Sequence, residues 1–222
     1  MRCLRHALFP GFTVAIIMLG AGGCASVDLS ESLPPPNPKP LGSIWIDPAR
    51  HELIVSGFVN QVQGAVELFA CGPGGKTHES ILVLFGEPAD IQTGLLLLGL
   101  KHGEPMKGLG QGPPEGDRVN LTVHWEQDGE VRFASAGELI LDYQRGKSFR
   151  NASWVFNGSK VENNYFLALA EESLIATYWD PWAIINIATS EGRDDERLAA
   201  NTKKLPPRQT PVRLVISPVH MP

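Results

Sequence analysis

The chain has 222 residues, of which 43% are hydrophobic and 19% charged, and its formal net charge at pH 7 is −5. A length of this order suits one folded domain. The acidic balance, without a basic stripe or an RNA-binding motif, argues against nucleic acid as a partner.

Residues 1–23 have the pattern of a bacterial secretory signal. Arg2 and Arg5 precede an apolar stretch, too short and too rich in Gly and Pro for a good membrane-spanning helix. The sequence Leu19-Gly20-Ala21-Gly22-Gly23-Cys24 resembles the bacterial lipobox, although Ala21 stands where Leu is usual. We therefore expect export to the cell envelope, cleavage before Cys24 and lipid on that cysteine. Ordinary signal cleavage nearby is the alternative.

Residues 24–42 are expected to form a spacer. Five prolines between Pro34 and Pro40 prevent a helix or a central strand, because proline lacks the backbone N–H. The folded domain is then expected at residues 43–222. Cys3 leaves with the signal and Cys24 is acylated, so Cys71 alone remains in the body and no intramolecular disulfide can form.

Most apolar runs of the body are short and resemble strands. Asp128-Gly129 predicts a hairpin turn, and Gly57 suggests a bulge in the second strand. The expected strands are 43–47, 51–60, 66–71, 80–85, 119–127, 131–134, 138–141, 153–156, 165–169, 174–178 and 211–217.

Two segments are expected to be helical. Pro88 suits a first turn and Asp90 complements the helix dipole, which predicts a helix over about 88–100. Its block of four leucines, Leu95 to Leu98, predicts that the helix is well buried. Residues 194–204 fit a second, short helix. The expected class is α+β, mainly antiparallel β.

Two blocks resemble the YdjY-like family of exported bacterial proteins. The first block runs from Glu67 to Gly99, and the second from Ser173 through Trp179-Asp180-Pro181 to Val212. The resemblance implies an exported domain without an established activity. An iron–sulfur cluster, which the family has been associated with, would need four thiolates, and the body has one. Trp179 stands where the family pattern has His, so a site built on that His is not expected here.

A glycine-rich segment, Ala70-Cys71-Gly72-Pro73-Gly74-Gly75-Lys76-Thr77, fits a loose phosphate-loop pattern, and Asp142 ends a run typical of a magnesium-binding strand. A phosphate loop must open a helix, and Gly86-Glu87-Pro88 leaves too little room for one. We therefore interpret the segment as a turn between two strands, and we expect no nucleotide and no cofactor.

Three residues are the candidates for a ligand or metal site: His78, Glu79 and Asp180. His78-Glu79 matches half of a zinc-protease motif, but Leu82 stands where the second His is needed. Bracing of turns is the alternative role for all three. Cys71 is expected to be a small buried hydrophobe rather than a reactive thiol.

These patterns favour a lipid-anchored envelope protein that binds a small ligand or an envelope protein without catalysis. A metal-dependent enzyme using His78, Glu79 and Asp180 is the second hypothesis.

Overall fold

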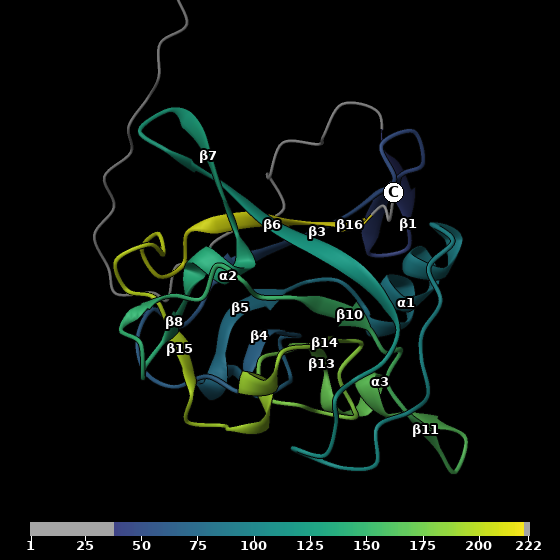
Figure 1. Ribbon diagram of the computed structural model, residues 1–222. Helices are drawn as coiled ribbons and strands as arrows, with labels where there is room; N and C mark the ends of the chain where they lie inside the picture. The colour runs from purple at the N-terminus through teal and green to yellow at the C-terminus, as the bar shows by residue number, and fades with distance from the viewer. Residues whose placement is uncertain (1–37, 220–222) are drawn as a thin grey trace, which may run out of the picture.

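The computed structural model describes residues 38–219, and the expected signal and lipobox therefore lie outside the described residues. Eight strands form a closed barrel in the order β3-β16-β6-β10-β14-β13-β4-β5, and β5 returns to β3 (Figure 1). Neighbouring strands are antiparallel except in the pairs β13–β14 and β4–β5. The expected class, mainly antiparallel β with some helix, is confirmed; the closure into a barrel was not predicted.

The barrel strands are β3 (Glu52–Val59), β4 (Leu68–Cys71), β5 (Ser80–Leu84), β6 (Asp117–Gln127), β10 (Trp154–Phe156), β13 (Ser173–Ala176), β14 (Ile185–Ile187) and β16 (Pro211–Pro218). Outside it lie β1 (Lys39–Leu41), β2 (Ile44–Asp47), β7 (Glu130–Ser135), β8 (Ile140–Asp142), β9 (Lys147–Ser148), β11 (Val161–Glu162), β12 (Tyr165–Phe166) and β15 (Leu198–Ala200). The helices are α1 (Pro88–Leu97), α2 (Ala136–Leu139) and α3 (Leu167–Glu171), with the 3₁₀ turns η2 (Thr77–Glu79) and η3 (Ser190–Arg193).

Alternation of side chains explains how the longest strands face the core. In β16, Val212, Leu214 and Ile216 are buried, and the residues between them are more exposed. The same period of two appears in β6. The turn between β6 and β7 has positive φ at both Asp128 and Gly129, which is the conformation that the Asp-Gly pair favours in two-residue hairpins.

Strand β3 closes the barrel because it changes partner along one edge. Its first half pairs with β2, and its last three residues pair with β5. Gly57 lies at the change, where a Cβ would come within 2.1 Å of the Val83 carbonyl oxygen. The glycine therefore permits close approach of β5, and its pairing with β16 runs through it without a register shift, so the expected bulge is wrong.

Helix α1 is less buried than the leucine block predicted. Pro88, Ile91, Gly94 and Leu95 face the core, whereas Leu96 and Leu97 are 46% and 64% exposed. The helix ends at Leu97, and positive φ at Gly99 follows the end. One face of α1 packs against β3, where the Leu53 side chain lies close to Gly94. The opposite face of the helix remains in solvent. The helix is thus confirmed, but its deep burial is not.

The second expected helix, over 194–204, is absent from the fold. Residues Leu198–Ala200 form β15, which pairs antiparallel with β8. An Arg197 Nη donates to the carboxylate of buried Asp142 at 2.9 Å, and this ion pair holds the segment extended beside β8. Helix propensity is a weak preference that such tertiary contacts override. Asp142, whose run of residues resembles the end of a magnesium-binding strand, is therefore bound by an arginine.

The core is one large cluster that joins the barrel strands to α1, β2, β8 and β15, and a smaller cluster contains Leu68, Cys71, Val83, Ala176 and Ala183. Lys39–Leu41, the last part of the expected spacer, form the outer strand β1 against β2. Within residues 38–219, no helix is long and apolar enough to span a membrane.

Candidate functional site

The glycine-rich loop after β4 is occupied by a carboxylate of the same chain. Glu172 Oε2 accepts the backbone N–H of Gly74 at 2.7 Å, and the Glu172 carbonyl accepts the N–H of Gly72 at 2.8 Å. A Cβ on Gly72 would lie 2.2 Å from Glu172 Oε2, so glycine is required for this approach. The loop leads into the single turn η2 and then into β5. The interpretation as a turn between two strands is confirmed.

Lys76, at the end of this loop, is bound to Glu67 just before β4. The Lys76 ammonium and the Glu67 carboxylate are 2.9 Å apart, and both side chains are partly buried. Burial opposes the charge on Lys76, but the hydrogen bond and the charge of Glu67 outweigh it and raise the pKa of Lys76. Lys76 is thus a structural cation, paired within the domain rather than presented to a phosphate.

Glu79 lies close to the same pair. Burial first, and then the nearby charge of Glu67, raise the pKa of Glu79, while Lys76 and His78 oppose this effect. Two carboxylates around one ammonium leave one negative charge incompletely balanced. Burial and this excess negative charge both favour protonation of Glu79.

Asp180 is buried in the loop after β13. Its Oδ1 accepts the N–H of Trp182 at 2.8 Å, and its own N–H donates to Asn186. Burial raises the pKa of Asp180, although the Trp182 N–H, the Ser173 hydroxyl and the Lys76 charge favour the ionised form. The expected turn-bracing role is what these hydrogen bonds perform.

His78 differs from its neighbours because its side chain is 75% exposed. Its Nε2 is 3.8 Å from Glu79 Oε1, and no hydrogen bond joins its ring to another residue within 38–219. Bracing of a turn is therefore not its role. The ring instead borders a groove of about 560 Å³, whose lining residues come from three separate parts of the chain: Asn60, Gln61, Val62, Gln63, Thr77, His78 and Arg208.

Arg208 forms the other charged side of the groove. Its Nε donates to the Asn60 carbonyl at 2.6 Å, and the Asn60 side-chain amide donates to the Ser80 carbonyl at 2.9 Å. The hydrogen bond to the Asn60 carbonyl uses one of the five guanidinium N–H groups of Arg208. The arginine is thereby oriented, and its terminal nitrogens have no partner among the described residues.

The three predicted site residues therefore have different environments. His78 lines the groove, Glu79 lies beside it in the Lys76–Glu67 cluster, and Asp180 is buried next to that cluster. Among residues 38–219, no three His, Cys, Asp or Glu side chains are placed to hold one metal ion. Cys71 is fully buried, and burial raises the pKa of its thiol, as expected for a packed hydrophobe.

Trp179 occupies the core at the position where a His was expected from the family pattern. It is 2% exposed, its Nε1 donates to the Ile187 carbonyl at 2.9 Å, and the Arg193 guanidinium lies 5.5 Å from its ring centre. The YdjY domain matches residues 44–217, which covers the barrel except for Pro218, the last residue of β16. The chain belongs to the YdjY domain family.

No curated protein and no solved structure matches this YdjY domain. Of the residues that line the groove, the sequence indicated only His78 as a site residue; Arg208 supplies the other positive charge, and the Asn60 carbonyl orients it. Arg208 follows Leu205-Pro206-Pro207 in a segment that carried the family resemblance, and Asn60 directly follows β3. An arginine directly after two prolines was the only sequence feature that could have indicated Arg208. Because Arg208 and His78 are 130 positions apart, the sequence did not show that both line one groove.

Proposed function

We propose that this YdjY domain is a lipid-anchored module of the bacterial cell envelope that binds a ligand carrying an anionic group, without catalysis. The observation that supports the binding site is the groove between His78 and Arg208. Two groups that carry or can carry positive charge there face solvent, one of them held by a backbone hydrogen bond. A guanidinium with free terminal N–H groups suits a carboxylate or a phosphate.

The remaining lining groups favour recognition rather than reaction. Gln61, Gln63 and Thr77 provide amide and hydroxyl groups, which donate and accept hydrogen bonds. Sites of this composition orient a polar ligand through a few convergent groups. No carboxylate is among the residues that line the groove, and Glu67 is bound to Lys76.

The anchor belongs to the proposal because of the lipobox-like sequence that ends at Cys24. Two or more acyl chains give stable attachment to a lipid surface, and the proline-rich residues after Cys24 would separate the domain from that surface. The ligand would then be met at the membrane face of the envelope.

A titration followed by NMR tests the groove, with inorganic phosphate and an acetylated dipeptide with a free C-terminal carboxylate as probes. We expect saturable shifts of the His78 ring signals with at least one probe. Arg208→Ala should abolish them, and Arg208→Lys should weaken them, because an ammonium lacks the planar pair of donors.

Arg150→Ala is the matched control, since Arg150 is exposed and far from the groove in sequence, paired with Glu138. His78→Ala should change the free energy of unfolding by less than about 0.5 kcal/mol, as expected for an exposed side chain. Shifts at His78 that are the same in Arg208→Ala and in the parent protein, or no shift with either probe, would contradict the proposal.

A further inference from the structure

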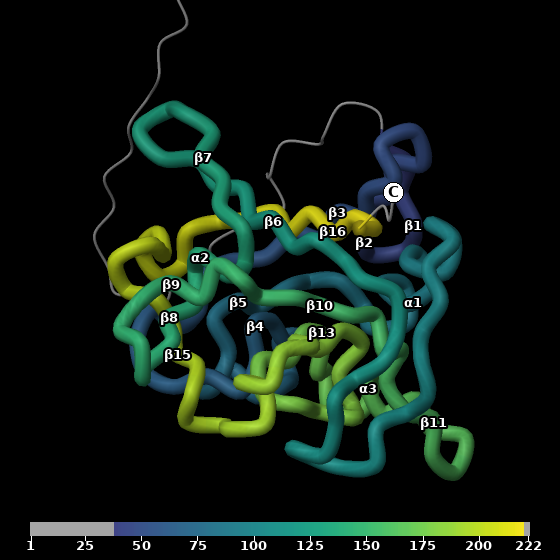
Figure 2. Tube along the Cα trace, viewed as in Figure 1, coloured from purple at the N-terminus to yellow at the C-terminus, as the bar shows by residue number. Residues whose placement is uncertain are grey.

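The β6–β7 hairpin extends away from the barrel and exposes a strand edge (Figures 1 and 2). Strand β6 pairs with β16 along one edge and with β10 and then β7 along the other. Strand β7 pairs with β6 over all six of its residues, and its second edge has no strand partner within residues 38–219. Such an edge presents a row of backbone donors and acceptors for another strand.

One face of this edge strand carries large exposed hydrophobic side chains. Val131 is 61% exposed and Phe133 is 71% exposed, and both lie on the same face because side chains alternate along a strand. The Phe133 ring stacks against His124 with centroids 5.7 Å apart, which orders the ring while one of its sides remains in solvent. Large exposed hydrophobic groups on a free edge indicate a surface that binds another strand.

The charges of β7 are self-complementary. Glu130 and Arg132 flank Val131 and pair with each other at 2.9 Å within the strand. If a second β7 is placed antiparallel with Val131 opposite Val131, each Glu130 faces Arg132 of the second copy. Phe133 then lies beside Gly129 of the second copy, where no side chain obstructs the ring. The register centred on Arg132 would instead place two arginines opposite each other, which is destabilising.

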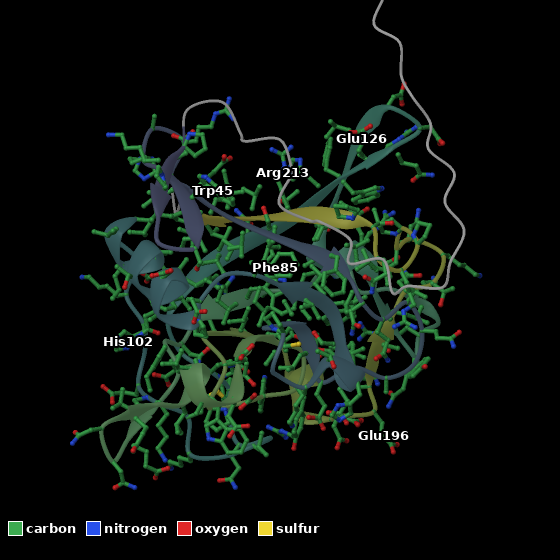
Figure 3. The ribbon with its side chains drawn as sticks, turned by 180° about the vertical axis from the view of Figure 1, so that it is seen from behind. Trp45, Phe85, His102, Glu126, Glu196 and Arg213 are labelled. Carbon is green, nitrogen blue, oxygen red and sulfur yellow. The ribbon has the colours of Figure 1, made fainter. Side chains whose placement is uncertain are left out.

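The charge of the hairpin tip decides against an anionic lipid surface as the occupant. Glu126, Asp128 and Glu130 are acidic and Arg132 is the only base between residues 126 and 132. Figure 3 shows Glu126 on the part of the hairpin that extends from the barrel. Anionic headgroups would repel this tip.

We propose that two copies of this chain associate through β7, in an antiparallel pair centred on Val131, so that their barrels form one continuous sheet. The inference is independent of the groove and of its ligand. The paired edge is short, so the dimer is expected to be weak in dilute solution and favoured where copies are concentrated.

Cysteine cross-linking in the full chain tests the register. In Val131→Cys the two introduced side chains would meet, with Cβ atoms roughly 5 Å apart. The matched control is Glu126→Cys, which lies opposite Val131 on β6 and is thus two further strand spacings from its counterpart, about 10 Å more. We expect a disulfide-linked dimer on mild oxidation for Val131→Cys and not for Glu126→Cys. Cys71 is buried and does not compete.

Charge exchange provides a second test by sedimentation. Glu130→Arg and Arg132→Glu should each weaken the dimer by about tenfold or more, because each places like charges opposite each other at two points. The double exchange, Glu130→Arg with Arg132→Glu, should restore it. Equal cross-linking of the two cysteine variants, cross-linking of Val131→Cys to a different protein, or failure of the double exchange to restore association would overturn the proposal.

Discussion

The carboxylate of Glu172 lies in the glycine-rich loop and accepts the N–H of Gly74 at 2.7 Å, across 98 positions of the sequence. A segment that matches a phosphate-binding pattern in its letters thus binds an anion that belongs to the chain itself. Glu172 adopts φ +47, a left-handed conformation that is unfavourable for a side chain with a Cβ. The contact with the loop holds this conformation in place.

Glu172→Ala should lower the free energy of unfolding by about 1 kcal/mol, because the exposed N–H of Gly74 loses its partner. Alanine keeps the left-handed strain, so the difference reports the carboxylate. Glu171→Ala, at the exposed neighbouring position, should change stability by less than about 0.5 kcal/mol. Chemical denaturation of both variants checks this. Equal stability of the two would show that the carboxylate contributes nothing to the loop.

ATP or GTP with magnesium should show no saturable binding to the purified protein in a calorimetric titration. The loop opens no helix, Glu172 binds the N–H groups of Gly72 and Gly74, and Lys76 is bound to Glu67. Lys76→Ala should lower stability, since it leaves the partly buried Glu67 without its cation. A micromolar binding constant that Lys76→Ala abolishes would contradict this prediction.

Cys24→Ser should permit export but release the protein from the membrane fraction, because serine cannot take the thioether-linked lipid. Fractionation and labelling with a radioactive fatty acid measure both effects. Ser26→Ala, a substitution two residues later, is the control and should remain acylated. A Cys24→Ser protein found entirely with membranes, and still labelled, would disprove the anchor.

The stability of the domain should respond to the ionisation of Asp180. Burial raises the pKa of Asp180 above its ordinary value, so the folded state holds this proton more tightly than the unfolded state does. As the pH rises from the pKa of Asp180 in the unfolded state to its higher pKa in the folded state, the free energy of unfolding decreases. Above the folded-state pKa, the full cost of the buried charge on Asp180 is present.

Asp180→Asn removes the titration, and its amide oxygen can still accept the Trp182 N–H. Relative to the parent protein, this variant should therefore gain stability as pH rises from about 3 to about 7. Asp180→Ala, which also lacks the acceptor, should be less stable than Asp180→Asn at every pH by about 1 kcal/mol. Parallel stability curves for Asp180→Asn and the parent would show that Asp180 has no perturbed ionisation.

Local sequence determined those elements in which a residue type strongly prefers one backbone conformation. Asp128-Gly129 produced the predicted hairpin, because both residues tolerate positive φ. Alternation of apolar residues placed β16, and Pro88 began α1. The turn between β4 and β5 also needed only sequence, since Gly86-Glu87-Pro88 leaves too little length for the helix that a phosphate loop must open.

Tertiary structure decided everything that depends on a distant partner. Residues 198–200 became a strand because β8 offered an edge and Asp142 bound Arg197. Half of α1 faces solvent, since the barrel contacts one side of a helix that is apolar on several. His78 and Arg208 border one groove because Arg208 donates to the Asn60 carbonyl across 148 positions. Closure of the barrel determines which distant residues line the same groove. A local pattern of residues cannot predict this, because it contains no information on contacts between distant segments.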